Sequence, residues 1–73
     1  MRTESQNYII WEYLKEHGEI NDDTCRQIGG GKRLAARVWD LRHLYGKEIL
    51  AKDVYKLNAR GKKYQDRVYY LEA

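Results

Sequence analysis

The chain has 73 residues, of which 42% are hydrophobic and 34% charged, and its formal net charge is +3. A chain of this length forms one domain over residues 1–73 and buries only about 60% of its unfolded surface, which leaves little room for a deep catalytic cleft. No apolar run approaches the roughly 20 residues of a membrane span. The single cysteine excludes an intrachain disulfide, and the first residues, MRTESQN, contain no hydrophobic stretch of the signal-peptide type, so we expect a cytoplasmic protein.

The charge is divided unevenly along the chain. Residues 1–25 carry two basic and six acidic side chains, whereas residues 26–73 carry twelve basic and five acidic ones. Such an asymmetry suggests a polyanionic partner, and the alternative is a solvated basic surface, which is common in small soluble proteins.

The first predicted element is a helix over residues 5–17, with Ser5 as N-cap and an apolar stripe at Ile10, Tyr13 and Leu14. Gly18 ends it, and GEI then predicts a strand of one or two residues. A second, short helix starts at the N-cap Asn21, with two aspartates in its first turn, and Cys25 and Ile28 form its apolar face up to Gly29.

A third helix is predicted from Lys32 to Tyr45. Its apolar line is Leu34, Val38, Leu41 and Tyr45, and its opposite side carries Lys32, Arg33, Ala36, Arg37 and Asp40. The preceding GGGK lacks the Ser or Thr that follows the lysine in a phosphate-binding loop, and a helix rather than a strand precedes it. We therefore interpret the three glycines as a tight turn between two helices.

The remainder has β character. Residues 48–57 and 63–72 are rich in Val, Ile and Tyr, and NARGK between them predicts a hairpin turn. The tip of this hairpin is basic, with Lys56, Arg60, Lys62 and Lys63. Tyr64 and Tyr70 are predicted to face the side opposite Tyr69 and Leu71 and to be partly exposed.

This order predicts an α+β fold of the winged helix-turn-helix type: three helices, a very short strand after the first, and a C-terminal β-hairpin, the wing. The chain also resembles small helix-turn-helix proteins of phages and prophages from Tyr8 to Leu71. The matching residues are Arg33, Leu34, Ala35, Ala36, Arg37, Val38, Asp40, Leu41, Arg42 and Ile49. It differs in the flexible GGGK and in two extra residues after Arg42. The resemblance implies DNA binding with the third helix in the major groove.

The expected partner is double-stranded DNA, and the expected role is that of a small transcriptional regulator. Its predicted contacts are Lys32, Arg33, Ala36 and Arg37 on the third helix and Arg60, Lys62 and Lys63 at the hairpin tip. Arg33 and Arg37 lie one helical turn apart and suit guanine edges, Lys32 suits a phosphate, and small Ala36 permits close approach. The hairpin tip suits the DNA backbone or the minor groove.

Several alternatives stay open from the sequence. Arg37 can instead pair with Asp40, and Arg42 is expected to cover the core or pair with an acid rather than read DNA. The aromatic residues are expected to supply much of the core volume, with Trp11 and Trp39 among them. No catalytic or metal-ligand pattern is present, so we expect neither an enzyme nor a cofactor, and a buried Cys25. The alternative function is a protein-binding module that docks on host transcription machinery.

Overall fold

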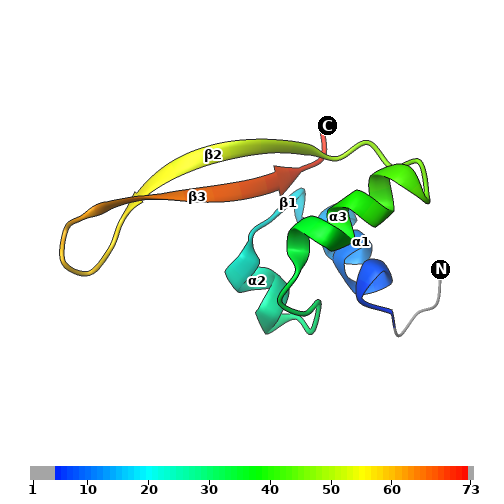
Figure 1. Cartoon of the computed structure of the whole chain (residues 1–73), viewed down its shortest axis with the longest axis horizontal. Helices are drawn as coiled ribbons and strands as arrows, with labels where there is room; N and C mark the ends of the chain where they lie inside the picture. The colour runs from blue at the N-terminus through cyan, green and yellow to red at the C-terminus, as the bar shows by residue number, and fades with distance from the viewer. Residues whose placement is uncertain (1–4, 73) are drawn as a thin grey trace.

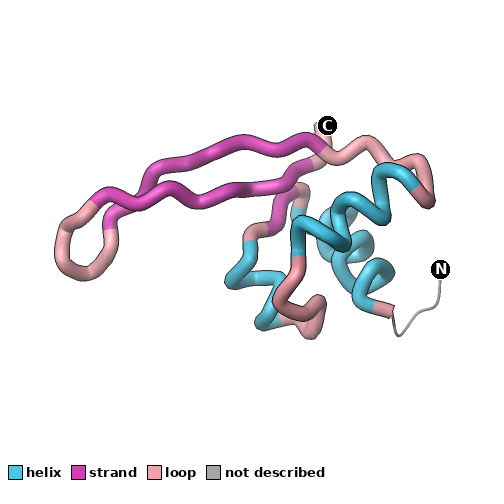
Figure 2. Tube along the Cα trace, in the orientation of Figure 1, coloured by secondary structure: helices cyan, strands magenta, loops and turns pink. Residues whose placement is uncertain are grey.

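A computed structural model describes residues 5–72; residues 1–4, which begin the segment MRTESQN, and residue 73 lie outside the described part. The protein has an α+β fold of three helices and a three-stranded antiparallel sheet (Figures 1 and 2). The elements in chain order are α1 (Gln6–His17), β1 (Glu19–Ile20), α2 (Asp22–Gln27), α3 (Leu34–His43), β2 (Leu50–Leu57) and β3 (Lys63–Tyr70). This order is compatible with the predicted winged helix.

The first two helices begin where their capping residues predict. Ser5 Oγ accepts a hydrogen bond from Tyr8 N at 3.1 Å, and Asn21 Oδ1 accepts one from Thr24 N at 2.9 Å. Each cap satisfies an N–H group that has no partner inside its helix. Gly18, with φ of 87°, ends α1 in the left-handed conformation and donates its N–H to the Leu14 carbonyl at 2.8 Å.

The three glycines form the turn between α2 and α3, as expected. Gly29 and Gly31 have φ of 86° and 89°, a region that L side chains rarely adopt. Gly30 serves a different purpose, because a Cβ atom there would lie 2.8 Å from Cys25 Sγ and 2.9 Å from Ile10 Cγ1. The turn therefore packs directly on α1 and α2.

The third helix is shorter than the sequence predicts. It begins at Leu34 rather than Lys32, since Gly31 has positive φ and Arg33 stands outside helical geometry with φ of −117° and ψ of 60°. It ends at His43 rather than Tyr45, with Leu44 as C-cap. Lys32 and Arg33 therefore lie in the turn that leads into the helix.

The sheet has the strand order β1-β3-β2, so β3 is central and β2 lies at an edge. β2 and β3 pair over eight residues each, from Leu50 opposite Tyr70 to Leu57 opposite Lys63. They project past the helices to one side, and the loop 58–62 is the end farthest from the helices (Figure 1). We call residues 50–70 the hairpin arm and residues 5–49 the body. The molecule measures 41 Å along its longest axis.

The core is mainly aliphatic, and this corrects the expectation that aromatic residues dominate it. Its buried hydrophobic residues are Ile10, Leu14, Ile20, Cys25, Leu34, Val38, Leu41, Ile49, Val68 and Tyr69. Trp11 and Tyr13 are half-buried at its margin. Trp39 was expected in the core but is 55% exposed, because it lies on the side of α3 away from Leu34, Val38 and Leu41. None of the described helices has the length and apolar character needed to cross a bilayer.

Candidate nucleic-acid interface

The turn before α3 presents two cations to solvent. Lys32 and Arg33 are both exposed, and neither forms an ion pair with an acid of residues 5–72. Arg33 makes no side-chain cap, and the first turn of α3 contains no acidic residue. The positive end of the helix dipole is therefore uncompensated there, which favours an anion.

Arg37 lies differently from its prediction. Its side chain is 32% exposed, and Nη1 lies 3.7 Å from Asp40 Oδ2, so the alternative of an ion pair with Asp40 is confirmed. Asn7 of α1 donates to the same carboxylate at 3.4 Å. Arg37 Nε and Asn7 Oδ1 are buried and have no hydrogen-bond partner within residues 5–72. Arg37 is thus half-buried and paired along α3 instead of fully exposed, and its contact with DNA stays a prediction.

The outward face of α3 is not the one that the sequence predicts. Ala36, Arg37 and Asp40 are half-buried, whereas Ala35, Trp39 and His43, each four residues from the next, are exposed. The Trp39 and His43 rings lie 4.6 Å apart between centroids. The spacing of these three residues in the sequence signals a common face, but the choice of outer face depends on where α1 packs.

Arg42 behaves as expected. Its Nε donates a hydrogen bond to the Ile49 carbonyl at 2.7 Å, and its guanidinium lies 5.8 Å from the centre of the Tyr69 ring. The side chain therefore covers the core where the body leads into β2.

The tip of the hairpin arm is held by one asparagine. Asn58 Oδ1 accepts hydrogen bonds from Arg60 N at 2.9 Å and from Lys62 N at 3.0 Å, and Asn58 N donates to the Lys62 carbonyl at 2.9 Å. These bonds leave the side chains of Arg60, Lys62 and Lys63 exposed, and none forms an ion pair with an acid of residues 5–72. The loop therefore presents three exposed cations on a backbone held by hydrogen bonds.

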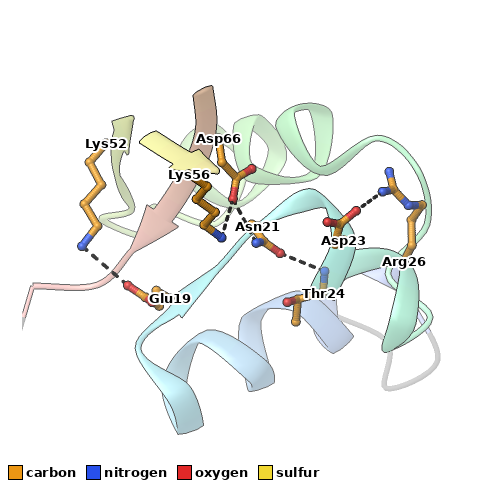
Figure 3. A network of polar contacts seen from close by, with 8 residues as sticks. All are labelled: Glu19, Asn21, Asp23, Thr24, Arg26, Lys52, Lys56 and Asp66. Carbon is orange, nitrogen blue, oxygen red and sulfur yellow. Dashed lines mark hydrogen bonds and ion pairs between the residues drawn. The ribbon is translucent and has the colours of Figure 1, made fainter. Parts of the chain in front are cut away.

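Lys56 was predicted to join this tip, but it is neutralised by the arm itself. Its Nζ lies 3.1 Å from Asp66 Oδ2. The hydrogen bond and the charge of Asp66 raise the pKa of Lys56 above its ordinary value. Asp66 also accepts a hydrogen bond from Asn21 Nδ2 at 3.1 Å, so the N-cap of α2, β2 and β3 meet at one carboxylate (Figure 3).

A second ion pair steadies the base of the arm. Lys52 Nζ lies 3.6 Å from Glu19 Oε2 of β1, close to the contacts of Asp66 (Figure 3). Both contacts lie on the same face of β2, because Lys52 and Lys56 are four residues apart on one strand. This face therefore carries the polar contacts of the arm with Glu19 and Asn21, whereas the other face carries Tyr69 in the core.

The exposed apolar side chains of the arm are only partly those that the sequence suggests. Tyr64 and Tyr70 lie on the face opposite Tyr69, as predicted, and Tyr64 is 45% exposed. The most exposed are Tyr55, at 74%, and Leu57, at 65%, which sequence analysis missed. Their alternation with Val54 and Lys56 predicts a common face but not which face is left uncovered.

The described residues offer little for metal or thiol chemistry. Residues 5–72 contain no group of three His, Cys, Asp or Glu side chains placed to hold a metal ion. Cys25 is buried, as expected, and its burial raises the pKa of its thiol. A protonated, buried thiol is a poor nucleophile.

Comparisons with protein-family models, curated proteins and solved structures find no match to this chain. The inferences about function below therefore depend on the geometry of the chain itself.

Proposed function

We propose that this protein binds double-stranded DNA through the turn before α3 and the tip of the hairpin arm, in the manner of a winged helix-turn-helix. One observation carries the proposal: the cations of residues 5–72 that lack a partner gather at these two places, as Lys32 and Arg33 and as Arg60, Lys62 and Lys63. The other cations pair with an acid or lie over an aromatic ring: Lys15, Arg26, Arg37, Arg42, Lys47, Lys52, Lys56 and Arg67. Unpaired cations are the ones free to neutralise phosphates.

In this proposal α3 lies in the major groove, with Lys32 and Arg33 on the flanking phosphates. The outer residues Ala35, Trp39 and His43 then face the base edges. Ala and aromatic side chains contact the thymine methyl group, while His can hydrogen-bond a base edge. Phosphate contacts supply most of the affinity, and the helix face supplies the sequence preference. The protein would then act as a small cytoplasmic regulator of transcription.

Charge-removing variants test the proposal by fluorescence anisotropy with a labelled duplex at about 50 mM and about 200 mM salt. Replacing both Lys32 and Arg33 by Ala should weaken binding at least about tenfold and lower the salt dependence by about one unit per lost phosphate contact. Replacing Arg60, Lys62 and Lys63 together by Ala should likewise weaken binding and lower its salt dependence.

The matched control is Lys15→Ala with Lys47→Ala, which removes the same charge as the α3 pair. Both lysines lie over the Trp11 ring, at 6.0 and 4.8 Å from its centre, and outside the proposed surface. This control should bind almost as the unmodified protein does. An equal loss in control and test variants, or no duplex binding at low salt, would contradict the proposal.

The C-terminal end of α3 favours protein binding as a second candidate. Trp39, Leu44 and Tyr45 are 55%, 65% and 41% exposed within a short stretch, and aromatic residues are enriched at protein interfaces. A stoichiometric protein captured from nuclease-treated lysate, identified by mass spectrometry and lost with Trp39→Ala, would support this candidate. Unchanged capture by Trp39→Ala would oppose it.

A further inference from the structure

We infer that the hairpin arm enters the minor groove of the bound DNA and inserts Tyr55 and Leu57 against the bases, so that the duplex bends on binding. This inference depends on the proposed DNA binding and adds to it a site, a binding mode and a measurable deformation. It begins from the two most exposed apolar side chains of the arm, which neither α3 nor the cationic tip explains.

Tyr55 and Leu57 form one apolar surface. They lie two residues apart on β2, so both point to the same face of the hairpin. In β3 they stand opposite Gln65 and Lys63, and a shallow hollow beside them is lined by Tyr55, Lys56, Leu57 and Lys63. A hollow that combines an aromatic ring, an aliphatic side chain and the ammonium group of Lys63, which is unpaired within residues 5–72, suits nucleobases next to phosphates.

The body does not cover this surface. The contacts that hold the arm, Lys56 with Asp66 and Asp66 with Asn21, involve the opposite face of the hairpin. Tyr55 and Leu57 share their face with Tyr69, which is buried in the core at the base of the arm, and they are exposed because the arm carries that face outward beyond the helices (Figure 1). Their exposure is a result of the length of the arm, which extends past the helices that cover Tyr69 (Figure 1).

Charge indicates what kind of partner fits. Leu57 is the last residue of β2, and Lys62 and Lys63 lie directly across the hairpin turn from it, with Arg60 in the same loop. These three cations lack acidic partners among residues 5–72. An apolar pair beside three free cations complements a polyanion that also offers apolar faces, which is the chemistry of DNA.

The width of the hairpin, compared with that of the DNA groove, then determines the binding mode. With α3 in the major groove, the neighbouring groove within reach of the arm is the minor one. Two paired strands are about 4.8 Å apart before their side chains are counted, whereas the minor groove of B-DNA is about 6 Å wide. The arm can enter only by widening the groove. Apolar side chains placed between base steps do this by partial unstacking, and they bend DNA by about 20–90°.

The test measures bending and unstacking separately from binding. A duplex of about 30 base pairs with a dye at each end reports bending by energy transfer, and 2-aminopurine within it reports unstacking. The unmodified protein should raise both the energy transfer and the 2-aminopurine fluorescence. Tyr55→Thr with Leu57→Thr keeps every cation and residues that favour strands, so it should bind within about tenfold of the original affinity and lose both signals.

The control variant is Tyr64→Thr, which alters an exposed tyrosine on the opposite face and should leave both signals unchanged. Binding by the unmodified protein without bending would overturn the inference and leave the proposed function standing, whereas absence of binding would remove the proposed function itself. Bending retained by the double variant would overturn the inference. So would tighter binding of single-stranded DNA than of duplex, or a dimer in sedimentation that needs Tyr55 and Leu57.

Discussion

The body and the hairpin arm are stabilised in different ways. The body and the base of the arm contain all the hydrophobic side chains that are buried within residues 5–72, whereas residues 50–67 contain no buried side chain. The arm relies on its strand pairing, on the Asn58 turn and on ion pairs such as Arg67 with Asp53 at 3.2 Å. A two-stranded hairpin is marginal alone, so the arm needs its contacts with β1 and α2. Its outer side chains are consequently free to serve binding.

Core truncation should show the largest difference between the two regions. Leu41 is 0% exposed, and Leu41→Ala should lower the free energy of unfolding by about 2–5 kcal/mol. Leu57 is 65% exposed, and Leu57→Ala should change the free energy of unfolding by less than about 0.5 kcal/mol. Urea denaturation followed by circular dichroism measures both. Equal losses would mean that the arm is part of the core.

Substitutions in the glycine turn should give the next largest loss of stability, and they distinguish a steric clash from an unfavourable backbone conformation. Gly30→Asn places a side chain 2.8 Å from Cys25 Sγ and should cost about 1–3 kcal/mol or more of unfolding free energy. Gly29→Asn is its matched control, because Gly29 has positive φ, which Asn tolerates, and open space around it. We expect less than about 1 kcal/mol there. Urea denaturation measures the loss in both variants. A larger loss for Gly29→Asn than for Gly30→Asn would show that the turn does not pack on α1.

The junction between body and arm should respond more weakly. Asp66→Asn removes the carboxylate that Lys56 and Asn21 share, with a loss of about 0.5–1.5 kcal/mol for the disturbed hydrogen bond to Asn21. Lys56→Ala leaves the bond to Asn21 in place and should destabilise the protein less.

The same variant tests the titration of Lys56. Its pKa is raised by Asp66, so the stabilisation is present below the ordinary pKa of lysine and disappears as pH rises through the raised value. In Asp66→Asn, NMR of the Lys56 side chain should show the pKa falling back toward its ordinary value. An unchanged pKa would contradict the pairing.

The tip should show the smallest effect on global stability. Asn58→Ala removes the acceptor for Arg60 N and Lys62 N, and amide hydrogen exchange at these two residues should accelerate while the unfolding midpoint hardly moves. Asn58→Asp keeps the acceptor and should preserve slow exchange. A large drop in the midpoint would show that the arm and the body unfold as one unit.

The sequence by itself determined the features that depend on neighbouring residues. Ser5, Asn21 and Gly18 mark helix ends because their hydrogen bonds reach only three or four residues along the chain. The hairpin with its basic tip and the alternation of Tyr64 and Tyr69 were likewise predicted, since strand geometry alone sets the alternation.

Only the tertiary structure decided which surfaces remain available for binding. Asp40 contacts Asn7 of α1 and pairs with Arg37, both residues are half-buried, and Ala35, Trp39 and His43 are left exposed on α3. The outward course of the arm leaves Tyr55 and Leu57 exposed, although Tyr69 on the same face is buried in the core (Figure 1). Both outcomes depend on packing between residues far apart in the chain, such as Asn7 with Asp40 and Tyr69 with the core residues of the helices. Local periodicity carries no information about such contacts, because it defines the faces of an element but not the neighbour that will cover one of them.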